Sequence, residues 1–241
     1  MKENIGTSPQ GTFLFRAISF ISRFRFSYLH RSTGQRQWPL VLFVLITGSA
    51  ALGIISLAAW LTKLPLLFPP LGPSAFILFY TPMSEQASPR SVFVSHAMGV
   101  SAGFAALWIM NWIFPDAGLL TTTSLGVPRI LTTALAMALV SVGMIGMRCP
   151  HPPAAATTLI VATGFLVEPA HVLGLMGAVS LLILEAIFFI RLQAGLPYPF
   201  WRSDPETSRQ YGSLAGIPKS GATFWQSLMA GAVFSNRNEL D

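Results

Sequence analysis

Two histidines, His96 and His151, occur in parts of the chain that are otherwise apolar. His151 stands in the stretch RCPHPPAAATTLI, residues 148–160, directly before a run of small residues. An imidazole titrates near neutrality, so His151 suits three roles: holding a turn by a hydrogen bond, binding an anion, or coupling to protons. The sequence leaves these roles open. We expect His96 to pair with His151 or with backbone carbonyls.

Charged residues beside or within the apolar segments form a second group of candidates. Arg90 and Arg148 each adjoin a proline-rich stretch, where they are either membrane-surface anchors or a funnel for anions. Glu185 lies inside an apolar segment, and a carboxylate at that depth is costly unless it has a function or a partner. Together with His96, these residues are our candidates for gating or coupling.

The motifs of most enzymes are missing from the sequence. There is no Walker loop, dinucleotide fingerprint, serine elbow or zinc-ligand spacing, and no nucleophile–base pair is visible. The single cysteine, Cys149, excludes an intramolecular disulfide and any multi-thiolate metal site. We therefore expect no enzymatic activity, no cofactor and no metal.

The elements that position these residues are membrane helices. The chain is 52% hydrophobic and 10% charged, whereas soluble domains carry about 25% charged residues. About 20 apolar residues cross a bilayer as a helix. The net charge of +6 comes mostly from the two ends of the chain, so it does not indicate nucleic-acid binding. Four apolar segments predict transmembrane helices in a lipid bilayer: 39–62, 91–115, 130–147 and 172–190.

Two proline-marked stretches about 80 residues apart indicate an internal repeat. PPLGPSAFILFYTP, residues 69–82, resembles CPHPPAAATTLIVA, residues 149–162, with Pro70, Pro73 and Ala75 matching Pro150, Pro153 and Ala155. Each stretch lies between two of the long apolar segments. The predicted fold is an all-α membrane protein of two related halves, with four full spans and two interrupted spans.

The interrupted segments, 64–82 and 150–167, are loaded with proline only in their first halves. Proline suits the first turn of a helix, so we expect short helices to start near Pro73 and Pro153, inside the membrane. Helix starts carry unpaired N–H groups and partial positive charge, which favour a small anion. The expected substrate-binding residues are Gly72, Pro73, Ser74, Ala75, His151, Pro152, Pro153, Ala154, Ala155, Thr157 and Thr158.

Charge also suggests the topology. If the interrupted segments cross, Arg90, Arg148 and Arg191 share a side with the N-terminus, which fits the positive-inside rule better than a re-entrant arrangement. The predicted protein is multi-pass in a bacterial inner membrane with both termini cytoplasmic; an organelle envelope is the lesser alternative. Small-residue helix faces make a homo-oligomer plausible. The predicted regions are a basic segment 1–37, a membrane domain 38–191 (repeats 38–115 and 126–191) and a tail 192–241.

These residues resemble a known family. His151-Pro152-Pro153-Ala154, followed by Ala155-Ala156-Thr157, is similar to the signature of the HPP family of integral membrane proteins. Gly72-Pro73-Ser74-Ala75 through Pro89-Arg90 and His96 resembles that family's first conserved block. Departures occur at Glu85–Ser91 and at Ala155. The resemblance implies a small multi-spanning membrane protein with a transport role, and plant relatives are linked to nitrite movement.

The sequence therefore predicts transport of a small solute, with an anion such as nitrite as the expected substrate. Two other functions remain open. Opposed half-helices also suit a channel for neutral solutes such as water or urea. The protein is alternatively a membrane scaffold or sensor that transports nothing.

Overall fold

The computed structural model describes residues 26, 37–121, 123 and 125–215, so the basic segment 1–37 and the end of the tail lie almost wholly outside the described residues. The described part of the chain is helical and contains no strand. Its main helices are α3 (Trp38–Thr62), α4 (Leu71–Tyr80), α5 (Pro89–Ile113), α6 (Val127–Gly146), α7 (Pro153–Ala162), α8 (Pro169–Phe188) and α9 (Pro205–Gln210). Shorter turns are η2 (Glu85–Ala87), η3 (Pro115–Ala117), η4 (Phe189–Gln193) and η5 (Gly212–Ala215).

Four of these helices are long and apolar enough to cross a membrane: α3, α5, α6 and α8 extended by η4. Proline occupies one of the first two positions of each, where its missing N–H costs nothing. Ser88 caps α5 by accepting a hydrogen bond from the N–H of Ser91. The prediction of an all-helical protein with four long spans is confirmed.

The two interrupted segments fold as an extended entry followed by a short helix. Helix α7 begins at Pro153 as predicted, whereas α4 begins at Leu71, two residues before Pro73, because Pro70 serves as its N-cap. Each short helix has 10 residues, which corresponds to about 15 Å. That length is half of a hydrocarbon core of about 30 Å.

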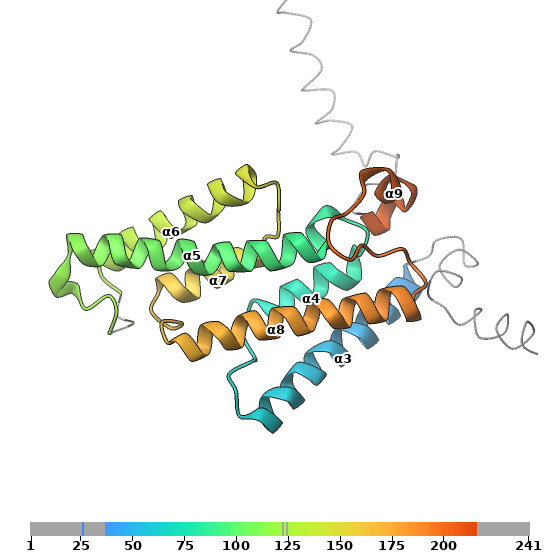
Figure 1. The fold of residues 1–241 in the computed structure, drawn as a ribbon, viewed down its shortest axis with the longest axis horizontal. Coiled ribbons are helices and arrows are strands. Elements are labelled where there is room, and N and C mark those ends of the chain that lie inside the picture. Colours follow the sequence, from blue (N-terminus) through green and yellow to red (C-terminus); the bar gives the residue numbers. More distant parts are fainter. Residues whose placement is uncertain (1–25, 27–36, 122, 124, 216–241) are drawn as a thin grey trace, which may run out of the picture.

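Each interrupted segment leads from one end of the bundle to the other. Figure 1 shows that α3 and α5 run in the same general direction, and that α6 and α8 both run in the reverse direction, so each interrupted segment carries the chain back along the bundle. Helices α4 and α7 lie between the long helices and extend from the middle in opposite directions. This is the arrangement expected of crossing segments rather than of re-entrant ones.

The packing partners are the same when the two halves are exchanged. Helix α3 packs on α4 as α6 packs on α7, and α5 packs on α7 as α8 packs on α4. Helix α5 also packs on α6 as α8 packs on α3, and the contacts of α5 with α8 and of α4 with α7 pair each helix with its own counterpart. Each short helix is therefore held partly by its own half and partly by the last helix of the other half.

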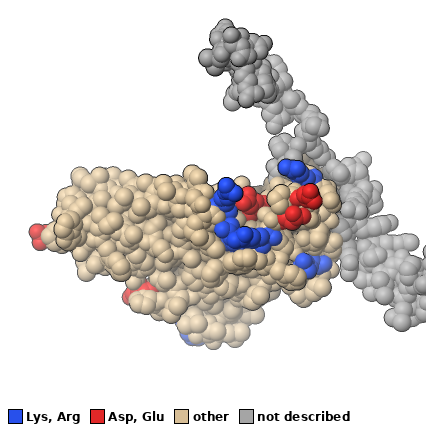
Figure 2. Space-filling model, turned by 45° about the horizontal axis from the view of Figure 1, so that its top comes forward, with Lys and Arg blue, Asp and Glu red and all other residues tan. Residues whose placement is uncertain are grey.

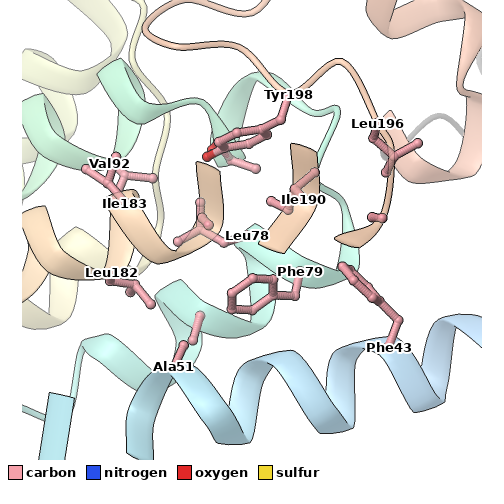
Figure 3. Close-up of a cluster of buried hydrophobic side chains, with 14 of the residues drawn as sticks. Phe43, Ala51, Leu78, Phe79, Val92, Leu182, Ile183, Ile190, Leu196 and Tyr198 are labelled. Atoms are coloured by element: carbon pink, nitrogen blue, oxygen red, sulfur yellow. The ribbon is translucent and has the colours of Figure 1, made fainter. Parts of the chain in front are cut away.

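The described part of the C-terminal tail packs on the bundle. Figure 3 shows Leu196 and Tyr198 in a cluster with residues of α3, α4, α8 and η4, among them Phe43, Phe79 and Ile190. The Tyr198 hydroxyl donates a hydrogen bond to the carbonyl of Ala87. Burial raises the pKa of this phenol well above its ordinary value. The tail thus covers one end of the membrane domain.

Candidate functional site

The starts of the two short helices meet through a side-chain contact. Ser74 lies in the first turn of α4 and His151 lies two residues before α7, and Ser74 Oγ is 2.9 Å from His151 Nε2. Both side chains are fully buried. The sequence predicted that these two helix starts point at one place, and the structure brings the named residues into contact there.

Helix α5 contributes a third member to this contact. His96 Nε2 lies 3.0 Å from Ser74 Oγ, and His96 Nδ1 lies 2.8 Å from Thr157 Oγ1 of α7. The two imidazole rings have their centroids 5.3 Å apart. None of these four side chains is exposed. We call the set Ser74, His96, His151 and Thr157 the junction.

A backbone carbonyl fixes the hydrogen positions in the junction. His151 Nδ1 lies 2.8 Å from the carbonyl oxygen of Gln86, which can only accept, so Nδ1 carries a proton. When both imidazoles are neutral, Nε2 of His151 accepts from the hydroxyl of Ser74, which also lies 2.9 Å from the Pro70 carbonyl. His96 donates to Ser74 through Nε2 and accepts from Thr157 through Nδ1. The junction is therefore a continuous chain of hydrogen bonds that runs from Thr157 to Gln86.

The loop before α7 is held in place by α5. Arg90 donates from Nη2 to the carbonyl of Met147 at 2.8 Å and from Nη1 to that of Arg148 at 2.9 Å. Ser95 donates to the carbonyl of Cys149. Arg148 adopts a φ of 49°, which non-glycine residues rarely take. This turn directs the chain from the end of α6 toward His151.

Two neighbouring cavities open at the surface beside the junction, and His151 lines one of them. The first, of about 220 Å³, contains three arginines and three serines, and we call it the arginine cavity. The second, of about 530 Å³, reaches His151, and we call it the inner cavity. Glu85 and Arg148 line both. The arginine cavity is lined by Glu85, Ser88, Arg90, Ser91, Met147, Arg148, Arg202 and Ser203. The inner cavity is lined by Glu85, Ser141, Met144, Ile145, Arg148, Pro150, His151 and Pro152.

Charged groups gather at the end of the molecule that contains the arginine cavity. Figure 2 shows blue and red atoms together on one half of the visible face, whereas most of the other half is tan. Within the arginine cavity the guanidinium groups of Arg90, Arg148 and Arg202 outnumber the single carboxylate of Glu85. The mouth of the cavities therefore carries a net positive charge.

The backbone N–H groups at the two helix starts are hydrogen-bonded, whereas the sequence predicted unpaired groups. The N–H groups of Leu71 and Gly72 donate to carbonyls of the preceding turn at 3.1 and 3.3 Å, and those of Ala154 and Ala155 do so at 3.0 Å. Proline at 73 and 153 has no N–H to offer. The expectation of unpaired N–H groups is wrong, because the proline-rich entries fold back as tight turns.

Several predicted binding residues shape the helix starts without joining the junction. Ala75 and Ala154 are buried, whereas Pro73 and Pro152 are exposed. A side chain at Gly72 would meet open space. Half-buried Ala155 and buried Pro153 belong to the first turn of α7 and form no hydrogen bond through their side chains.

Thr158 packs against α5. Its hydroxyl donates to the carbonyl of Ala154 within α7. A Cβ at Gly99 would lie 2.7 Å from that carbonyl oxygen and 2.9 Å from Thr158 Oγ1. Gly99 and Gly103 therefore let α5 approach α7 closely, as expected of a small-residue helix face.

Glu185 is buried in α8 and lies apart from the cavities. Its side chain is 7% exposed, and within the described residues neither carboxyl oxygen has a hydrogen-bond partner. It lines neither the arginine cavity nor the inner cavity. Among the described residues, Glu185 therefore has no histidine or arginine partner.

Two contributors to the site, and one residue that holds the far end of α7, were not anticipated from the sequence. The Gln86 carbonyl orients His151, and Arg202 comes from the tail. Buried Arg129 donates to the carbonyl of Ala162, the last residue of α7, at 3.0 Å and to that of Leu119 at 2.9 Å. The signal for Arg129 was its position on the side opposite to the other arginines, where the positive-inside rule does not place it.

The fold and the site define a small helical membrane protein with two half-length helices and a buried His–Ser–His contact between their starts. A family model described as "HPP, transmembrane region" matches residues 33–199. The chain belongs to the HPP family. Neither a curated protein nor a solved structure matches it.

Proposed function

We propose that this protein transports a small solute across a membrane, through a passage that opens at the junction. The observation that carries the proposal is the contact between Ser74 and His151, which joins two helices that start in the middle of the bundle. Irregular backbone at membrane depth persists only where protein or a watery cavity meets it. In transporters, short proline-interrupted segments at equivalent positions of two halves mark the substrate site.

The junction is closed in this structure. All four ring nitrogens of His96 and His151 have hydrogen-bond partners, and the side chains are fully buried. A solute that passes must therefore separate Ser74 from His151 and take over their hydrogen bonds. Because the contact joins α4 to α7, a small movement of one half against the other opens it.

A small anion such as nitrite is the proposed substrate. Three guanidinium groups line the arginine cavity, and Arg148 continues into the inner cavity that reaches His151. Charge of one sign in a cleft with low-dielectric walls raises the local concentration of counter-ions. Serine hydroxyls beside the arginines add donors for an anion that is losing its hydration water.

We also propose that the two halves form an inverted repeat in a bacterial inner membrane, with both ends of the membrane domain in the cytoplasm. The exchange symmetry of the helix contacts supports the repeat. The start of α3, the start of α5 and the end of the α8–η4 span lie at the same end of the bundle (Figure 1). Arg90 in the first turn of α5 donates to the carbonyl of Arg148, so both arginines belong to this end, which supports the orientation.

Uptake by purified protein in liposomes tests the proposed function. We expect uptake of nitrite above protein-free liposomes, with nitrate, formate and chloride as competitors. Changing His151→Ala removes a junction member and should abolish uptake. His171→Ala is the matched control, because half-buried His171 pairs with Glu168 at 3.7 Å and lines neither cavity.

Three results would count against the proposed transport of an anion. Anion uptake that stays at the level of empty liposomes for all four anions argues against an anion transporter. Faster osmotic swelling in urea, without anion uptake, would instead favour a channel for neutral solutes. Absence of both activities would favour the scaffold alternative.

A further inference from the structure

The geometry of the junction points to a binding site for one proton at His151, taken up together with the transported anion. This inference rests on the proposed function and adds the coupling ion to it. It arises from the Ser74 hydroxyl, which has one hydrogen to donate but three neighbours at hydrogen-bond distance. Pro70 O and His151 Nε2 lie 2.9 Å from Ser74 Oγ, and His96 Nε2 lies 3.0 Å from it.

With both imidazoles neutral, these contacts cannot all be hydrogen bonds. Gln86 holds the proton of His151 on Nδ1, so Nε2 of His151 is bare and requires the hydrogen of Ser74. The Pro70 carbonyl can only accept, so it receives nothing from the Ser74 hydroxyl in this state. One of the observed contacts is left without a hydrogen.

One added proton at Nε2 of His151 satisfies the whole set. His151 then donates to Gln86 through Nδ1 and to Ser74 through Nε2, and the Ser74 hydrogen turns toward the Pro70 carbonyl. His96 continues to donate to Ser74. The proton therefore enters without movement of any heavy atom, because Ser74 already has an acceptor waiting.

The same proton on His96 is less well accommodated. Its Nδ1 would have to donate to Thr157, whose hydroxyl now donates to it. Thr157 would then need another acceptor for its own hydrogen, and the described part of the structure shows no second hydrogen bond from this hydroxyl. This asymmetry assigns the proton to His151.

A cation at His151 needs a negative partner, because a buried unpaired charge is costly. The ionisable groups near it are His96 on α5, Cys149 in its own loop, and Glu85 and Arg148, which line the inner cavity with it. Glu85 is exposed, and no carboxylate among the described residues lies within ion-pair distance of His151. An anion in the inner cavity supplies the missing charge, so anion and proton bind cooperatively.

Proton movement during anion uptake tests this inference. Liposomes that contain the protein and a trapped pH dye are given nitrite or nitrate outside, and protein-free liposomes correct for leakage of nitrous acid. We expect the lumen to acidify by one proton per anion, with a rate that does not respond to a potassium–valinomycin potential. The variant His151→Gln should lose the acidification, whereas His171→Gln should retain it.

A second measurement avoids reliance on the folding of a variant. Wild-type protein in detergent and weak buffer should take up about one proton per chain when nitrite or nitrate is added, and none when gluconate is added. Anion uptake that is driven by an inside-positive potential without acidification would overturn the proton site and leave the transport function intact. If neither anion is taken up, the proposed function fails and the coupling fails with it.

Discussion

The hydroxyl of Ser74 lies 2.9 Å from Nε2 of His151, and this hydrogen bond joins residues that are 77 positions apart and belong to different halves of the chain. It closes the space between the starts of α4 and α7. Because His96 and Thr157 complete the same chain of hydrogen bonds, a change at Ser74 affects both imidazoles at once.

Replacing Ser74 by alanine should destabilise the protein and impair transport. The change leaves Nε2 of both His96 and His151 buried without a partner, which costs about 1–3 kcal/mol for each unsatisfied group. Thermal unfolding in detergent should show a lower Tm than wild type. Ser74→Thr keeps the hydroxyl, so its Tm should fall less than that of Ser74→Ala. An unchanged Tm for Ser74→Ala would show that the junction is not the tight contact described.

Close packing of α5 on α7 makes Gly103 sensitive to a single methyl group. A Cβ at this position would lie 2.6 Å from Cβ of Val161, and overpacking of this kind costs about 1–3 kcal/mol. Gly103→Ala should therefore lower the Tm. Gly53→Ala is the matched control, because the added methyl meets no other part of the protein within 4 Å beyond its own stretch of α3 and alanine favours helix. Equal Tm values for the two variants would contradict the packing.

Arg129 should matter for the end of α7. Two of its nitrogens donate to the carbonyls of Ala162 and Leu119, and hydrogen bonds from charged donors contribute about 1.5–3 kcal/mol each. Arg129→Lys cannot reproduce the fork and should lower the Tm. Arg209→Lys, on exposed α9, should leave it unchanged. Tolerance of Arg129→Lys would show that this end of α7 is held by other contacts.

Arg202 links the tail to anion capture. It lines the arginine cavity but contacts neither the junction nor the inner cavity. Arg202→Gln should raise the KM for nitrite by roughly threefold to tenfold and leave kcat nearly unchanged. The positive potential of the arginine cavity raises the local concentration of anions and so affects their binding, not the later steps of transport. High salt should diminish the difference between wild type and variant. Arg209→Gln is the control. If Arg202→Gln lowered kcat and left KM unchanged, Arg202 would act after the anion has bound, which contradicts its proposed role in anion capture.

The docked tail should loosen at high pH. Burial raises the pKa of Tyr198 above that of a free phenol, which is about 10. The folded state therefore binds this proton more tightly than the unfolded state, and its contribution to stability is complete below pH 10 and falls as the pH rises further. Limited proteolysis of the tail should accelerate above pH 10 in wild type. Tyr198→Phe should remove this added sensitivity, and an identical pH profile in both proteins would contradict it.

The sequence predicted the parts of this fold that depend on local chemistry. Proline placement located the starts of α4 and α7 to within two residues, because proline restricts its own φ and the residue before it. It also placed Ser74 and His151 at one site. It could not predict that the N–H groups of the helix starts are paired, because this depends on how the entries turn.

Contacts that depend on tertiary packing could not be predicted from the sequence. The carbonyl of Gln86 has no side-chain signature, and Arg202 reaches the site only because Tyr198 and Leu196 pack the tail on the bundle. Glu185 is the opposite case, a residue that the sequence marked as a candidate and that lies away from the site. Its position in an apolar segment marked it as a candidate, but only the structure shows that it lines neither cavity.

Accessibility of position 74 during transport tests the central claim most directly. In a Cys149→Ser background, Ser74→Cys is labelled with a water-soluble methanethiosulfonate reagent, with Thr121→Cys in the exposed connection between η3 and α6 as the control. We predict that nitrite slows labelling at position 74 only, and that labelled protein no longer takes up nitrite. Labelled protein that transports at the unmodified rate would show that the solute does not pass between Ser74 and His151.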